Sequence, residues 1–216
     1  MKKSLIFTMI TAEMALYAGE SEFIRQELVC GGAAQQFRLN ASKPEHFNRK
    51  PIEASCVQAD NDQNNLYLTI TMKDNDIMGE AEKNQSSLGS FGDAVQIFLK
   101  SEKETFFWEF QADPFGKKSC FFHPGAGRIF YPEAGSEFPD FTVENTRADG
   151  EWKIKITIPL SIFREKGFKF TNDENWTFMI VRHNFSRFND AKEASSYPQA
   201  VGRIYNPDRF GKLIIK

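Results

Sequence analysis

The chain contains 216 residues, 22 of which are Phe, and its 27 basic residues nearly balance its 29 acidic ones. It has no long basic stripe, which argues against binding to the phosphate backbone of a nucleic acid. The length suits one sizeable hydrophobic core, and the abundance of Phe, a residue that fills pleated surfaces, favours an all-β protein.

The first eighteen residues are typical of an export signal. A basic start at Lys2 precedes an apolar stretch, Leu5–Ile10, and small residues up to Ala18. We therefore expect residues 1–18 to be a cleaved signal peptide and residues 19–216 to form one domain. The mature protein is then expected in the periplasm, at the cell surface or outside a bacterial cell. An amphipathic N-terminal helix is the alternative, and no later segment approaches the length of a membrane span.

Three cysteines, Cys30, Cys56 and Cys120, are spread along the chain. In an exported protein two of them can form a disulfide, and Cys30 with Cys56 is the first pair to test because both precede the central hairpin. Their spacing fits no zinc motif. Structural burial is the default expectation for all three.

The first predicted hairpin joins Ile52–Ala59 to Leu66–Met72. In the second of these segments Leu, Ile and Met alternate with Tyr and Thr, as expected of a strand with one buried face. The polar residues 60–65 are predicted to form the turn between the two strands. Residues 73–90 are predicted to form a long polar loop.

Two aspartate pairs lie beside these strands, Asp60 with Asp62 and Asp74 with Asp76. Both are candidates for binding calcium, which takes six to eight oxygen ligands. Turn chemistry explains Asp and Asn at such positions without an ion and is the favoured interpretation. We therefore expect no cofactor, and structural calcium is the one ion left open.

The central hairpin lies within Gly92–Gly116. Its two segments, Ala94–Lys100 and Phe106–Asp113, alternate with period two around a short polar connection. One face carries Val95, Ile97, Leu99, Phe106, Trp108 and Phe110, and the other carries Gln96, Phe98, Phe107, Glu109 and Gln111. The first face is predicted to belong to the core. The second is either the floor of a ligand site or a solvated outer face of the sheet.

Further short strands follow at close spacing. They are predicted at Ser119–His123, Phe141–Arg147, Trp152–Ile158, Trp176–His183 and Phe210–Ile215. A helical turn is expected at Leu160–Lys166 and a polar loop at Asn184–Ala194. Many short strands separated by turn signals indicate an all-β fold, a two-sheet antiparallel β-sandwich of the immunoglobulin or jelly-roll kind.

Several motifs occur in a familiar order. They are GDAVQIFL from Gly92, FFWEFQADPFG from Phe106, the strand from Trp152 to Leu160, WTFMIVR from Trp176, SSYP from Ser195 and NPDRFG from Asn206. In this order the chain resembles the family 9 carbohydrate-binding modules and their relatives in the DOMON-like β-sandwich group. The resemblance covers the chain from about Ile52 to the C-terminus.

The resemblance implies a function as well as a fold. Well-studied members of the family hold the end of a sugar chain between two aromatic side chains, and polar residues of a sheet face bind the hydroxyls. The family module is non-catalytic, and calcium in some members is structural. A carbohydrate is thus the expected ligand, and glycoside hydrolases or a surface glycan-capture system are the expected partners in polysaccharide catabolism.

The family's site residues carry over position by position. Tyr197 matches an aromatic platform before the final NPDRFG motif, and Phe91 is the aromatic residue nearest to the other platform. Gln96 stands where the family can place a Glu, and Gln111 where an Arg can sit. Amides still donate to and accept from hydroxyls.

Two further residues complete the candidate sugar site. Glu109 shares the face of Gln96, and Arg182 ends a strand beside a polar loop, where His183 and Asn184 could line the same rim. A structural Arg182 that pairs with Asp93 or Glu109 fits the pattern equally well.

Two other functions have candidate residues in this chain. Some DOMON-like domains bind haem through Met and His, and this chain has the candidates Met72, Met78, Met179, His46, His123 and His183. Glycoside hydrolysis needs two carboxylates across a cleft, but no pair among Glu109, Asp113 and Asp140 is marked by its spacing. No G-x-S-x-G motif is present, so catalysis is not expected.

Overall fold

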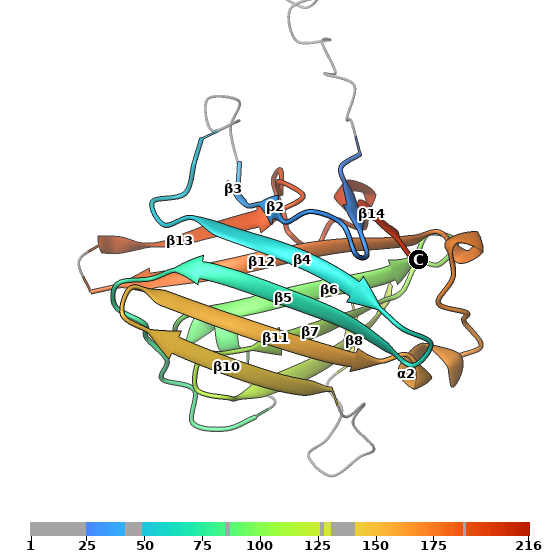
Figure 1. The fold of residues 1–216 in the computed structure, drawn as a ribbon, viewed down its shortest axis with the longest axis horizontal. Coiled ribbons are helices and arrows are strands. Elements are labelled where there is room, and N and C mark those ends of the chain that lie inside the picture. Colours follow the sequence, from blue (N-terminus) through green and yellow to red (C-terminus); the bar gives the residue numbers. More distant parts are fainter. Residues whose placement is uncertain (1–24, 42–48, 85–86, 126–127, 131–140, 188) are drawn as a thin grey trace, which may run out of the picture.

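Two β-sheets pack face to face in the computed structural model of the protein (Figure 1). It describes residues 25–41, 49–84, 87–125, 128–130, 141–187 and 189–216. The predicted signal peptide lies outside these residues. The architecture is the predicted β-sandwich.

The larger sheet, sheet A, has nine strands within the described residues. Its main path runs β1 (Glu27–Val29), β14 (Gly211–Ile214), β12 (Trp176–Ser186), β6 (Ala94–Ser101), β7 (Phe107–Ala112), β8 (Lys118–Gly125) and β9 (Arg128–Phe130). Strand β13 (Asn189–Tyr197) also pairs with β12, and β3 (Arg38–Leu39) pairs with β13. Only β1 and β14 pair in parallel among these strands.

The smaller sheet, sheet B, is antiparallel and has five strands in the described part of the chain. Their order is β10 (Thr142–Ala148), β11 (Glu151–Pro159), β5 (Asn65–Lys73), β4 (Ser55–Asn61) and β2 (Gln35–Gln36). The predicted hairpin of Ile52–Ala59 with Leu66–Met72 is the β4–β5 pair, which places Val57 opposite Ile70.

The helices are short. They are η2 (Leu88–Ser90), α2 (Ser161–Arg164), η3 (Asn172–Glu174) and η4 (Pro207–Arg209). The helical turn predicted after Pro159 is α2. No helix in the described ranges is long and apolar enough to cross a membrane.

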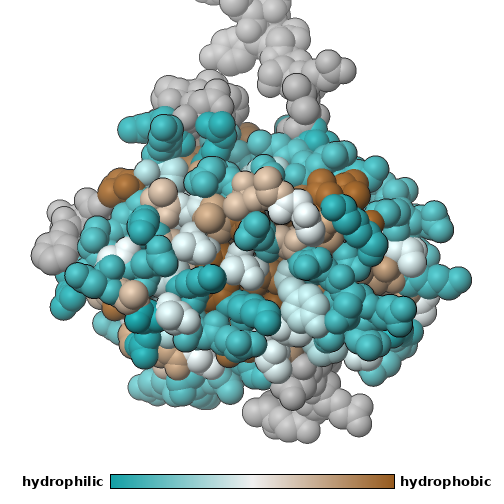
Figure 2. Space-filling model, viewed as in Figure 1, coloured by the Kyte–Doolittle hydropathy of each residue, from teal (hydrophilic) through white to brown (hydrophobic). Residues whose placement is uncertain are grey.

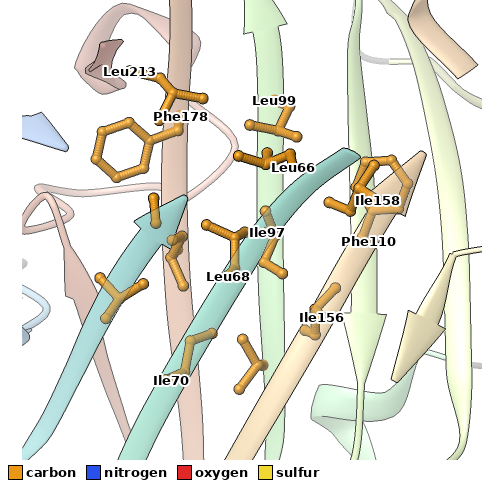
Figure 3. Packing of buried hydrophobic residues seen from close by; sticks show 14 of the residues in the cluster. Leu66, Leu68, Ile70, Ile97, Leu99, Phe110, Ile156, Ile158, Phe178 and Leu213 are labelled. Atoms are coloured by element: carbon orange, nitrogen blue, oxygen red, sulfur yellow. The ribbon is translucent and has the colours of Figure 1, made fainter. Parts of the chain in front are cut away.

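The core fills the space between the two sheets, as the period-two patterns require. Alternate residues of each strand point inward, so Leu66, Leu68 and Ile70 of β5 meet Ile97 and Leu99 of β6 (Figure 3). Val95, Ile97 and Leu99 are at most 1% exposed, which confirms the core face predicted for the central hairpin. The register of the hairpin places Gln96 opposite Gln111 and Leu99 opposite Trp108, so the residues predicted to share a face do share it.

The outer faces of the two sheets differ. On sheet B the outward residues of β5 and β11, such as Thr69, Thr71, Lys153 and Lys155, are partly or fully exposed, and Figure 2 shows a mainly hydrophilic surface on this side. The outer face of sheet A is instead buried around its central strands. The buried polar side chains that lie on an outer sheet face are therefore those of sheet A.

Two predictions about the chain's organisation were wrong. Residues 184–194 are not a loop, because β12 continues to Ser186 and β13 returns from Asn189. Strand β13 was missed because its sequence, NDAKEASSY, is polar and lacks apolar alternation. None of the three cysteines forms a disulfide, and the expected burial holds for Cys30 and Cys120 but not for Cys56, which is only partly covered.

Arg182 joins the two sheets from inside the sandwich. It lies opposite Val95 on the inward side of β12 and is 1% exposed. Its guanidinium donates to Asp74 Oδ2 at 3.1 Å and to Ser55 Oγ at 3.0 Å. Ser55 begins β4 of sheet B, and Asp74 directly follows β5 of the same sheet. Glu53 Oε2 is a further carboxylate partner, at 3.4 Å. The interpretation of Arg182 as a structural residue thus holds, but with partners other than Asp93 and Glu109.

Replacing Arg182 with Leu should lower the free energy of unfolding by about 3–5 kcal/mol, because Asp74 would stay buried without its cation. Urea denaturation measures this loss. The control is Lys73→Ala, which breaks the exposed Lys73–Glu151 pair and should cost less than about 1 kcal/mol. Equal losses in the two variants would contradict the structural role of Arg182.

Candidate functional site

Aromatic side chains cover one end of the outer face of sheet A. Phe98, Phe107 and Phe210 form a second hydrophobic cluster there with Met179 and Val181, all at most 6% exposed. The rings pack edge to face or tilted, with centroids 5.8–6.0 Å apart. Phe98 and Phe107, predicted to lie on a mixed face, are thus on a face that is buried.

Beside this cluster lie the predicted polar residues, which contact one another. Gln96 Nε2 donates to Glu109 Oε1 at 3.0 Å, and Gln111 Nε2 donates to the same oxygen. Gln96, Glu109 and Gln111 are 1–3% exposed. The interpretation of this face as a solvated outer face of the sheet is therefore wrong. Together with two histidines they form what we call the polar row.

The two histidines close the polar row at its ends. His123 Nε2 lies 2.6 Å from Glu109 Oε2, and its ring stacks on Phe107 at 4.3 Å. His183 Nε2 lies 2.5 Å from Gln96 Oε1. Glu109 thus binds partners from three strands, β6, β7 and β8. No group of three or more metal-ligating side chains occurs within the described ranges.

The short helix η2 covers one end of the polar row. The backbone N–H of Leu88 donates to Gln111 Oε1 at 2.7 Å. Gly89 packs against His183 so closely that a Cβ at this position would lie 2.6 Å from the imidazole Cδ2. Lys192 Nζ donates to the carbonyl of Gly89 from the other side. Polar residues of the sheet therefore fix the position of this helix.

Phe91 directly follows η2 and is 46% exposed. Its segment pairs with an adjacent one through the Gly79–Gly92 bridge. Asp93 locks this arrangement, because its carboxylate accepts from the backbone N–H of Met78 at 2.5 Å and of Phe185 at 2.8 Å. Phe91 is thus an exposed ring on a turn that is held by hydrogen bonds at both ends.

Tyr205 is an exposed aromatic residue at the other end of the polar row, beside His123. It is 43% exposed, and its ring packs on Phe98 at 5.3 Å and beside His123 at 5.6 Å. The sequence prediction missed it, although it stands directly before the NPDRFG motif and belongs to no alternating strand. That adjacency is the signal that could have found it.

Two predicted site residues lie on the opposite side of sheet A. Tyr197 faces Ile180 across the strands, is 8% exposed and belongs to the main core. Its hydroxyl donates to the carbonyl of Glu27 at 2.6 Å. Arg182 also points inward, toward Ser55 and Asp74. Neither side chain is placed to contact a ligand on the outer face.

The calcium candidates are engaged with the protein itself. Asp62 accepts from the backbone of Asn64 and Asn65, both at 2.7 Å, which is a turn geometry. Asp60 accepts from the adjacent N–H of Asn61 at 2.9 Å.

The second aspartate pair is similar. Asp74 pairs with Arg182, and Asp76 Oδ2 accepts from the backbone of Arg187 at 2.7 Å. Asp74 Oδ1 also accepts from the backbone N–H of Asp76 at 3.1 Å, which is a turn contact.

The residues named for the other two functions are also accounted for. Met72 lies in the main core and Met179 in the second cluster, while His123 and His183 are hydrogen-bonded in the polar row. His46 and Asp140 lie outside the described residues.

A groove of about 700 Å³ lies elsewhere, between α2, η3 and the C-terminal residues. It is lined by Asn61, Asp62, Gln63, Leu160, Arg164, Phe170, Thr171, Asn172, Ile215 and Lys216. Asn172 is already bonded in both directions to the backbone of Ile215, at 2.6 and 2.8 Å. None of the sugar-contact candidates lines this groove.

Comparison with solved structures finds similar folds. A candidate carbohydrate-binding protein from Bacteroides uniformis has a TM-score of 0.62 at 13% identity, over 89% of this chain and 97% of that one. A family 9 carbohydrate-binding module from Caldicellulosiruptor kristjanssonii in complex with glucose has a TM-score of 0.54 at 12% identity, over 89% and 95%. The module from that organism with cellotriose has a TM-score of 0.56 at 13% identity, over 89% and 93%.

The chain has the fold of the family 9 carbohydrate-binding modules. No known family model and no curated protein matches the sequence. The match to the family 9 fold spans nearly the whole of each solved structure. Function must therefore be argued from the residues of this chain.

Asp93 makes the stability of the protein depend on pH. Burial raises the pKa of its carboxyl group to about 7. The folded protein then holds a proton near pH 5–7 that the unfolded chain binds only near pH 4, so the contribution of Asp93 to the free energy of unfolding rises as pH falls from 8 to 5. The lowered pKa of His183 acts in the opposite direction below about pH 6.5, so the contribution of Asp93 is the difference between wild type and Asp93→Asn.

Urea denaturation at several pH values measures this, and the slope should stay below about 1.4 kcal/mol per pH unit. In Asp93→Asn this contribution should vanish. A wild type that parallels Asp93→Asn over this range would contradict the assignment.

Proposed function

We propose that the protein binds carbohydrate without catalysing a reaction, between Phe91 and Tyr205 on the outer face of sheet A. The observation that carries the proposal is that these two exposed aromatic rings stand at opposite ends of one polar row. Aromatic rings stack on the C–H faces of sugars, and polar groups nearby bind hydroxyls. The similar folds solved with glucose and cellotriose add support.

The register of the strands gives the offset of these two ends along the strand direction. Helix η2 rests on Gln111, at the level of Gln96, whereas Tyr205 rests on Phe98, two residues further along β6. Two residues of a strand span about 7 Å. The two ends also lie over different strands, since η2 contacts His183 of β12 and Tyr205 contacts His123 of β8. We propose that the sugar binds in the space between these two ends.

The polar row would act mainly by holding this site in shape. Its amides are engaged with Glu109, His183 and the backbone of Leu88, so stacking supplies most of the contact with the ligand. We further propose that the protein is exported and meets its ligand outside the cytoplasm, in the setting of polysaccharide breakdown. Partner hydrolases are part of this proposal.

Removal of either ring tests the site. Phe91→Ala and Tyr205→Ala should each weaken the binding of glucose or cellotriose about tenfold or more, because each loses one stacking face. Isothermal titration calorimetry measures the affinity. Tyr67→Ala is the control, since Tyr67 is a partly exposed aromatic residue of β5 in sheet B, where its ring contacts Lys155 and not the polar row. Unchanged affinity in both test variants would refute this site.

A further inference from the structure

Phe115 is another exposed aromatic residue close to Phe91 in the fold. It is 48% exposed and lies in the turn between β7 and β8. The carboxylate of Asp113 holds this turn, because its Oδ1 accepts from the backbone N–H of Phe115 at 2.9 Å and of Lys117 at 2.7 Å. The ring of Phe115 thus belongs to a turn whose backbone is fixed by hydrogen bonds, as the ring of Phe91 does.

Two glycines lie between Phe115 and Phe91. Gly92, which follows Phe91, pairs with Gly79 in an antiparallel bridge. A Cβ at Gly79 would lie 2.5 Å from Phe115 Cδ2 and 2.6 Å from its Cε2, so the ring packs directly against this glycine. The ring therefore starts within about 4 Å of the Gly79 Cα, and bridged Cα atoms are about 4.5–5.5 Å apart, so Gly92 lies within about 10 Å of the ring.

The ring of Phe115 has one open face. Only its Cδ2 and Cε2 atoms approach the Cβ position of Gly79, and no other ring atom is closer to it than Asp113 Oδ2, at 3.7 Å. The ring thus turns an edge, and not a face, to Gly79. The guanidinium of Arg147 lies over one face, 4.7 Å from the ring centroid. The exposed surface of Phe115 therefore belongs to the other face and the outer edge of the ring.

We propose that Phe115 forms a second subsite, in which its ring stacks on a further pyranose unit of a sugar chain whose terminal unit binds beside Phe91. The inference rests on the proposed function. A pyranose C–H face stacks on an open aromatic face, and the glycine pair presents no side chain between the two rings. Arg147 adds guanidinium N–H groups beside the ring, which can donate to hydroxyls. The ligand class is therefore an oligosaccharide and not a free monosaccharide.

The ratio of the affinities for cellotriose and glucose measures this subsite. Isothermal titration calorimetry should show that wild type binds cellotriose about three- to tenfold more tightly than glucose, because only the longer ligand reaches Phe115. Phe115→Leu and Phe115→Met keep an apolar side chain against Gly79 but lack the flat ring. Both should lose the preference for cellotriose, with a glucose affinity within about twofold of wild type. Phe115→Tyr keeps the ring and should keep the preference.

Tyr67→Leu is the matched control, since it removes a partly exposed ring from sheet B and should leave the affinity ratio unchanged. Circular dichroism and thermal melting establish that the variants fold. A wild type without preference for cellotriose, a preference retained in the folded Leu or Met replacement of Phe115, or an equal loss of affinity for both ligands in these replacements would each overturn the inference. Failure of wild type to bind either sugar would instead refute the proposed function, before any variant is made.

Discussion

The centre of sheet A is buried on both of its faces, and the rest of the structure follows from this constraint. Strands β6, β7 and β12 turn one face to sheet B and the other to the Phe98–Phe107–Phe210 cluster and the polar row. A polar side chain on such a face must find partners within the protein, because a buried group without one costs free energy. The network around Glu109 meets that requirement.

The same network shapes the proposed binding site. Glu109 orients Gln96 and Gln111 by accepting from both, and Gln111 in turn holds the backbone of η2 next to Phe91. At the other end, His123 bonds to Glu109 and contacts Tyr205. One buried carboxylate thus links two exposed aromatic residues that are 114 positions apart in the sequence. Pre-organisation of this kind lowers the entropic cost of binding a ligand.

The sequence predicted the sandwich because alternation reveals which side of a strand is buried, as for Val95, Ile97 and Leu99. It could not reveal that the second side is buried too, since Gln96 and Glu109 look like surface residues until their partners are known. Tyr197 failed for another reason. Its parity on β13 points it inward, but a polar strand such as β13 carries no alternation from which to read that parity. Tyr205 lies outside any strand, where patterns give no direction.

The most direct test of this account is the crystal structure of the protein with cellotriose. One sugar ring is expected between Phe91 and Tyr205, on the outer face of sheet A. A sugar bound elsewhere, for example in the groove beside Arg164 and Phe170, would contradict it.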